Sequence, residues 1–202
     1  MEETQHNVQF YKESLRKVET DIMKQLETGK ASKDIIGEAF ETHRERIWKY
    51  FGFNVSKEKH GAKFDVDWAV TYKGKLIALE EDKGHYVDSC FLERALSGFS
   101  KTVYAYKQEG KQVPLLILHS FTRYNKYNEK FEEDMNTRKP EIKDELKKKM
   151  VYSTLVNRDR LPKEEWIGSK KSTRNDSYSH FSEDDLIQKD IEFIKSLIPV
   201  SE

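Results

Sequence analysis

The sequence predicts an α/β fold in which a central mixed β-sheet is flanked by helices. Three patterns lead to this class: long segments whose apolar residues recur at three- and four-residue steps, a short segment in which they alternate, and a brief apolar run between turn residues. A hairpin followed by a helix and a buried strand gives a sheet with both antiparallel and parallel neighbours.

Four segments have the periodicity of amphipathic helices, each followed by glycine or proline. They are residues 8–26, 33–51, 91–108 and 183–198. The first helix can cover the core or pair with a second copy of the chain, and its few heptads favour the covering role. His43 falls on the apolar face of the second helix, where we expect a packed histidine rather than a metal ligand.

Five shorter segments are typical of strands, namely residues 53–56, 64–72, 76–83, 113–119 and 150–156. Residues 64–72 alternate between apolar and polar, and Lys73-Gly74 supplies a turn before the return strand. Residues 113–119 are apolar almost throughout, as in a strand that is buried on both faces.

The register of the hairpin decides which charged side chains meet. A three-residue loop over residues 72–74 puts glycine at the left-handed position and Asp65 opposite Glu81. A two-residue turn instead pairs Asp67 with Glu80. We expect the three-residue loop. Four charged residues then share one face and one end of the sheet: Asp65, Asp67, Glu81 and Lys83.

Carboxylates that lie close together repel each other unless a cation compensates them. Mg²⁺ prefers oxygen ligands and commonly uses one or two carboxylates together with substrate phosphate, and we expect Mn²⁺ to substitute for it. An adjacent lysine can hold the attacking water or neutralise charge on the phosphate. This set of groups indicates phosphodiester hydrolysis.

The chain contains Asp67, a spacer and then Glu81-Asp82-Lys83. This arrangement resembles the motif of the PD-(D/E)xK nuclease superfamily, in the version found in its resolvases and restriction enzymes. The resemblance covers about residues 33–120. It implies a restriction-endonuclease-like core with the order helix, three-stranded meander, helix, strand.

The resemblance also implies roles for individual residues. Asp67 and Glu81 would bind the metal with the backbone carbonyl of Asp82, Lys83 would be the catalytic lysine, and Glu41 would be an added catalytic glutamate from the preceding helix. Two departures leave alternatives open. Val66 replaces the usual proline, so Asp65 could be the motif aspartate, and the acidic neighbours of Glu81 allow a frame with Glu80 and Asp82 as the working pair.

Basic, aromatic and amide residues interleave in residues 120–130, and short basic runs occur at 147–149 and 169–174. Such mixtures suit contacts to phosphates and base edges. The expected partner is double-stranded DNA. The candidate contacts are Arg123, Lys126, Lys170, Lys171 and Arg174.

Composition excludes several other classes. Aromatic residues make up 12% of the chain, which argues for a packed core. No apolar run has the length of a membrane span, the first residues lack the apolar stretch of a signal peptide, and the single cysteine, Cys90, excludes an internal disulfide. We therefore expect a soluble, intracellular, cytoplasmic protein without a membrane partner.

The sequence thus predicts one nuclease domain over residues 1–202. Residues 1–30 form an N-terminal helix for capping or dimerisation, residues 33–120 the catalytic core, and residues 121–202 a DNA-contacting region with the C-terminal helix. The expected function is that of a Mg²⁺-dependent DNA endonuclease, a type II restriction enzyme acting as a homodimer. The alternatives are a Holliday-junction resolvase, a repair nuclease, or an inactive nucleic-acid-binding module on the same core.

Overall fold

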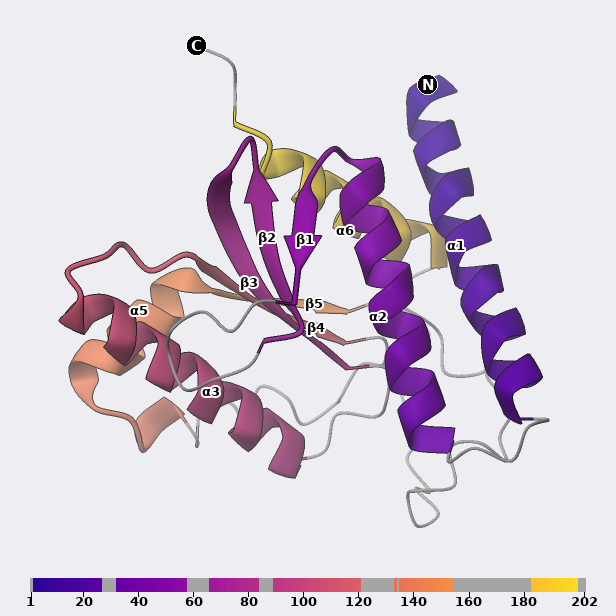
Figure 1. Ribbon diagram of the computed structural model, residues 1–202. Coiled ribbons are helices and arrows are strands. Elements are labelled where there is room, and N and C mark those ends of the chain that lie inside the picture. Colours follow the sequence, from indigo (N-terminus) through magenta and orange to yellow (C-terminus); the bar gives the residue numbers. More distant parts are fainter. Residues whose placement is uncertain are drawn as a thin grey trace.

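The computed structural model describes residues 2–26, 32–57, 66–83, 89–120, 133, 135–154 and 183–199. Two helices and then three strands open the chain, and from α3 onward helices and strands alternate (Figure 1). In chain order they are α1 (Glu2–Leu26), α2 (Ser32–Tyr50), β1 (Asn54–Ser56), β2 (Trp68–Tyr72), β3 (Lys75–Lys83), α3 (Ser89–Gln108), β4 (Leu115–Ser120), α5 (Pro140–Lys149), β5 (Met150–Thr154) and α6 (Glu183–Ser196).

The described strands form one sheet with the order β1-β2-β3-β4-β5. The first three strands are antiparallel neighbours, whereas β4 runs parallel to both β3 and β5. The mixed sheet that the sequence predicts is therefore confirmed. Strands β3, β4 and β5 all end at one edge of this sheet, at Lys83, Ser120 and Thr154, and we call this edge the carboxyl edge.

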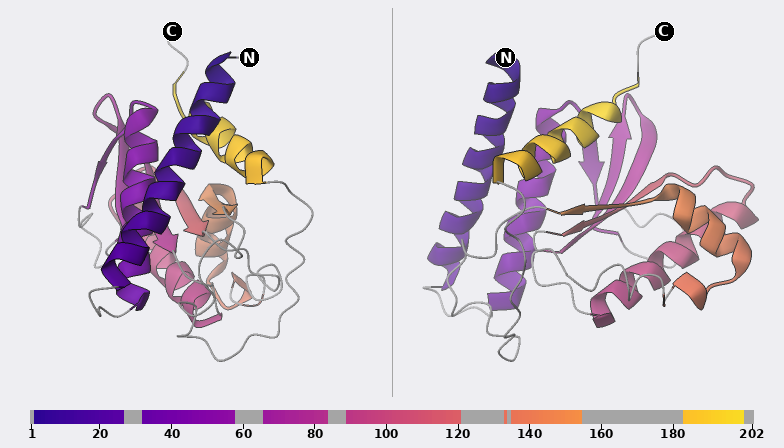
Figure 2. Two further views of the ribbon diagram at one scale, coloured as in Figure 1. Left: turned by 90° about the vertical axis from the view of Figure 1, so that its right-hand side faces the viewer. Right: turned by 180° about the vertical axis from the view of Figure 1, so that it is seen from behind.

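Helices cover both faces of the sheet (Figures 1 and 2). Helices α1, α2 and α6 pack on one face, around Trp48, Trp68, Val70 and Ile117. Helices α3 and α5 pack on the other face. Helix α1 buries Tyr11 and other apolar side chains against α2 and α6, so it covers the core as its pattern predicts.

The β2–β3 hairpin closes more tightly than expected. Tyr72 pairs with Lys75, so the loop consists of Lys73 and Gly74 alone, with φ of 48° and 78°. Positive φ at both central residues is the geometry of a type I′ turn, which matches the twist of the flanking strands. The prediction of a three-residue loop is therefore wrong, because Lys73 as well as Gly74 adopts the left-handed conformation.

A β-bulge follows this turn and changes the register again. Ile77 is an extra residue on β3, and beyond it Trp68 pairs with Glu80. Asp67, the residue before Trp68, therefore lies beside Glu81. Because directly opposed residues of antiparallel strands point to the same face, Asp67 and Glu81 share the face that α3 and α5 cover.

Two other features differ from the sequence-based expectation. Strand β2 begins at Trp68 rather than at residue 64, and residues 58–65 lie outside the described part of the chain. Helix α5 was not expected, because its segment looked only polar and basic, yet it buries Ile142 and Leu146. None of the described helices is long and apolar enough to cross a membrane.

Candidate active site

The candidate site lies at the carboxyl edge, where Asp67 directly precedes β2 and Glu81 is near the end of β3. The backbone N–H of Asp82 donates a hydrogen bond of 2.7 Å to Oδ2 of Asp67. This N–H belongs to the peptide that joins Glu81 to Asp82, so the Asp67 carboxylate is held within one peptide unit of Glu81. Both side chains are half-buried. Two of the residues that the sequence selects therefore lie on adjacent strands at the same edge.

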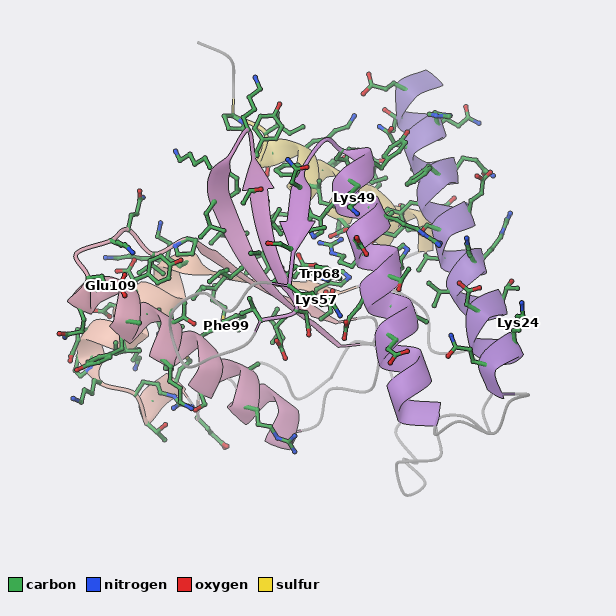
Figure 3. The ribbon with its side chains drawn as sticks, in the orientation of Figure 1. Lys24, Lys49, Lys57, Trp68, Phe99 and Glu109 are labelled. Atoms are coloured by element: carbon green, nitrogen blue, oxygen red, sulfur yellow. The ribbon has the colours of Figure 1, made fainter. Side chains whose placement is uncertain are left out.

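Glu41 lies near the same edge but on α2, the helix that covers the opposite face of the sheet from Asp67 and Glu81. Its Oε2 forms an ion pair with Nζ of Lys57, the residue that follows β1. The Lys57 ammonium lies 5.2 Å from the centre of the Trp68 ring, and Trp68 is next to Asp67 in the chain (Figure 3). We call Glu41, Lys57, Asp67 and Glu81 the edge site.

Several carboxylates raise the pKa of the Lys57 ammonium. Its hydrogen bond to Glu41 raises the pKa of Lys57 above its ordinary value, and the charges of Asp67 and Glu38 raise it further. Glu38 and Glu41 of α2, together with Asp67, thus favour the charged form of Lys57. Local sequence pattern does not single out Lys57, because its partner Glu41 lies on another element of the chain.

The chemistry of the edge site fits a hard divalent cation. Its acidic members supply only carboxylate oxygens, the ligands that Mg²⁺ prefers, and the Lys57 ammonium stands where positive charge is favoured. Asp67 and Glu81 are the side chains that would hold such an ion. Within the described ranges, no group of three or more His, Cys, Asp or Glu side chains is arranged to hold a metal ion, so Glu41 does not complete a three-carboxylate site with them.

Other sequence-selected residues fall partly or wholly outside the described structure. Lys83 ends β3 and pairs with Ser120 of β4, which sets its backbone two residues beyond Glu81. Asp65 is not among the described residues, and its expected pairing with Glu81 is wrong, because the bulge brings Asp67 to that position. The candidate DNA contacts also lie outside the described residues: Arg123, Lys126, Lys170, Lys171 and Arg174.

The basic run 147–149 is described, and it forms the last turn of α5. Met150 follows it directly and pairs with Leu116 near the start of β4. This run therefore lies toward the end of the sheet away from the carboxyl edge and the edge site.

The opposite face of β3 carries a second set of charges, which we call the core network. Arg44 of α2 donates from Nε to Oε1 of Glu80 at 2.5 Å and from Nη1 to Oδ2 of Asp190 of α6 at 2.6 Å. Trp48 Nε1 also donates to Glu80, at 3.1 Å to Oε2, and the Tyr11 hydroxyl donates to Asp190 at 2.8 Å.

The core network is sealed from solvent. The side chains of Arg44 and Glu80 are 0% exposed, and that of Asp190 is 1% exposed. Burial alone would lower the pKa of Arg44, but the Asp190 and Glu80 carboxylates raise it well above its ordinary value. Glu80 is therefore paired inside the core, and the frame in which Glu80 and Asp82 act as the working pair does not fit this geometry.

Asp82 also turns its side chain toward the core network rather than toward Glu81. Its Oδ2 accepts a hydrogen bond of 2.8 Å from Trp68 Nε1, and its Oδ1 has no hydrogen-bond partner among the described residues. Burial, followed by the Glu80 charge, raises the pKa of Asp82 well above its ordinary value. The contact of Asp82 with the edge site is through its backbone N–H, which donates to Asp67.

Two histidines complete the buried polar region. His43 shares a hydrogen bond of 2.8 Å between Nδ1 and Ser14 Oγ, so it is a packed histidine as expected. His119 pairs with Asp82 in the β3–β4 ladder. Burial lowers the pKa of both histidines well below the ordinary value, and Arg44 lowers it further.

Comparison with known proteins adds no relative to this description. No protein-family model matches the chain, and the comparisons with curated proteins and with solved structures find no significant match. A function must therefore be inferred from the side chains themselves.

Proposed function

We propose that this chain is a metal-dependent nuclease that hydrolyses phosphodiester bonds in DNA, with the edge site as its active site. The observation that carries the proposal is the 2.7 Å hydrogen bond from the Asp82 N–H to Asp67 Oδ2, together with the register beside Glu81. Glu41, the added glutamate that the resemblance implies, lies near the same edge on α2, where it pairs with Lys57.

Each residue of the edge site has a physical role in the proposal. Asp67 and Glu81 would hold the cation, and the N–H of Asp82 holds the Asp67 carboxylate in position. A divalent cation, when bound, would supply a water of lowered pKa and stabilise negative charge on the phosphate. Lys83, two residues after Glu81, would be the lysine that orients the attacking water or offsets charge on the phosphate.

DNA is the proposed substrate because of the basic residues that follow β4 in the sequence. Strand β4 ends at Ser120, beside Lys83, and Arg123 and Lys126 come next in the chain, outside the described residues. Basic side chains of this kind would contact the phosphate backbone and make binding sensitive to salt. A type II restriction enzyme that acts as a homodimer is the subtype we propose, since a twofold dimer reads a palindromic site.

The test is cleavage of supercoiled plasmid DNA with Mg²⁺, with Mn²⁺ and with EDTA. Wild type, Asp67→Asn and Lys83→Met are compared, with Glu45→Gln as the control, since Glu45 lies on α2 and pairs with Lys49 away from the edge site. We expect cleavage by wild type and the control only when metal is present. We expect each of the two site variants to lose activity by about a hundredfold or more.

Other outcomes would change the proposal in defined ways. Discrete fragments would identify a sequence-specific enzyme, whereas nicking confined to branched substrates would indicate a resolvase or repair nuclease. Salt-sensitive DNA binding without cleavage under any of the metal conditions would replace the nuclease with an inactive binding module.

A further inference from the structure

Helix α3 has a basic and aromatic outer face. Its inner face is buried against the sheet and α5 through Ala95, Leu96, Phe99 and Val103. The residues on the opposite side recur at three- and four-residue steps, so they form one line along the helix. We call this line the α3 stripe, and it consists of Arg94, Ser97, Lys101, Tyr104 and Gln108.

The α3 stripe contains two cations and no acidic residue. Arg94 and Lys101 are both exposed, and neither forms an ion pair with a described residue. Lys107 lies on the same helix but off the stripe, and it provides the contrast. Its ammonium donates to the backbone carbonyl of Glu141 at 3.0 Å and lies 3.8 Å from the Glu145 carboxylate. Lys107 therefore joins α3 to α5, whereas the charge of the stripe is open to a ligand.

Tyr104 adds an aromatic ring to the stripe. It alone among the described large apolar and aromatic side chains is exposed, at 55%. Protein-binding surfaces are built around an apolar centre, which one tyrosine among polar neighbours does not supply. Arginine, lysine, tyrosine, serine and glutamine side chains are instead the groups that contact phosphate oxygens in protein–DNA complexes. The chemistry of the stripe thus favours a phosphate backbone over a protein partner.

The stripe begins on the side of the carboxyl edge. Strand β3 ends there at Lys83, and α3 is the next element, beginning at Ser89. Its first turn lies nearer to that edge than its last turn does (Figures 1 and 2). From Arg94 to Tyr104 the stripe is about 15 Å long, which is the length of about four base pairs of a duplex.

We propose that the α3 stripe binds the sugar–phosphate backbone of duplex DNA, with Arg94 and Lys101 on phosphates and the Tyr104 hydroxyl donating to a phosphate oxygen. The inference rests on the proposed function only in taking DNA as the partner, and it requires neither a bound metal nor cleavage. Contacts of this kind fix the orientation of the duplex and carry no sequence information. Because they release counter-ions, they weaken as salt rises.

The experiment measures the binding of a short, fluorescently labelled DNA duplex by anisotropy over a range of salt concentrations. EDTA is present throughout, so that cleavage does not enter the measurement. Wild type is compared with Arg94→Gln/Lys101→Gln and with the charge-preserving Arg94→Lys/Lys101→Arg. The control is Arg16→Gln/Lys17→Gln, which removes two exposed cations from α1, on the other face of the sheet.

We expect Arg94→Gln/Lys101→Gln to bind the duplex about tenfold more weakly, or worse, at about 0.1 M salt. Its plot of log affinity against log salt should be shallower by about 2, since each lost phosphate contact removes about 0.9 from the slope. The charge-preserving variant and the control should bind like wild type. This pattern would separate contact at the stripe from a general effect of net charge.

The other outcomes distinguish this inference from the proposed function. If Arg94→Gln/Lys101→Gln binds like wild type, or if the control loses as much affinity, the role of the stripe is wrong while the nuclease proposal stands. If wild type binds no duplex at any salt concentration, the inference fails together with DNA as the substrate. Binding that depends on the stripe, in a protein that cleaves no plasmid, would keep the inference and overturn the catalytic proposal.

A parallel titration with labelled polyglutamate tests the alternative partner, an acidic polypeptide. We expect wild type to bind it much more weakly than DNA. Equal affinity of wild type for both, lost for both in Arg94→Gln/Lys101→Gln, would contradict the assignment to DNA.

Discussion

Strand β3 carries charged side chains on both of its faces, and they differ in burial and in pairing. Toward α1, α2 and α6, Glu80 is fully buried and bound by Arg44 and Trp48. Toward the other face, Glu81 is half-buried at the carboxyl edge beside Asp67. Neighbouring residues of the same type thus have different environments, which follows from the two-residue period of a strand.

This contrast distinguishes charged side chains that stabilise the fold from those that are exposed enough to bind a ligand. A buried ion pair is expensive to desolvate and cannot be approached by a substrate, so the core network joins α2, β3 and α6 and does no chemistry. In the edge site, by contrast, Asp67 and Glu81 are half-buried, and Glu41 forms a partly exposed ion pair with Lys57. We propose that this charge is available to a metal ion and a phosphate.

The largest effect that would test this contrast is the removal of Arg44. Arg44→Met leaves the Glu80 and Asp190 carboxylates buried without their cation, so we expect a loss of about 3–5 kcal/mol in the free energy of unfolding. Chemical denaturation measures it, with Lys49→Met as the exposed control. A loss below about 1 kcal/mol would mean that the core network does not hold these elements together.

The next effect concerns pH and Asp82. Its pKa is raised in the folded protein from an ordinary value of 3.8, so the folded state holds the proton more tightly than the unfolded state. The free energy of unfolding therefore decreases as pH rises above about 4 toward the folded-state pKa. Asn cannot ionise, so we expect Asp82→Asn to gain stability relative to wild type across that range.

Urea denaturation from pH 4 to pH 8 measures this difference, with Asp144→Asn on the exposed side of α5 as the control. A difference between Asp82→Asn and wild type that stays constant with pH would show that Asp82 is ionised in the folded protein throughout.

The smallest effect is expected at the surface ion pair of the edge site. Glu41 and Lys57 are 22% and 60% exposed, and pairs of this kind contribute little to stability. Glu41→Gln should change the free energy of unfolding by less than about 1 kcal/mol. Thermal denaturation checks this, and a larger loss would assign Glu41 a structural role instead of a place in the edge site.

Much of the fold could be predicted from local pattern. The periodicity of α2 and α3 and the apolar run of β4 depend on each segment alone. The hairpin register could not be predicted, because it depends on left-handed Lys73 and on the bulge at Ile77, neither of which the alternation of residues reveals. In this register Asp67 and Glu81 still lie side by side at the carboxyl edge, because the tighter turn and the bulge replace the three-residue loop.

The core network was beyond sequence reasoning for a related reason. Arg44 and Asp190 are far apart in the chain, and each looks like an ordinary polar residue of an amphipathic helix. The polar character of α5 hid its two buried residues, Ile142 and Leu146, in the same way. Long-range pairing decides these positions, and a single sequence does not record it.

The most direct test of the account compares Glu80→Gln with Glu81→Gln in two assays, thermal denaturation and metal-dependent plasmid cleavage. We predict that Glu80→Gln lowers the melting temperature by several degrees but keeps its cleavage rate per folded molecule. Glu81→Gln should melt like wild type and lose cleavage. If Glu80→Gln lost cleavage while still folded and Glu81→Gln remained active, the two faces of β3 would have been assigned the wrong way round.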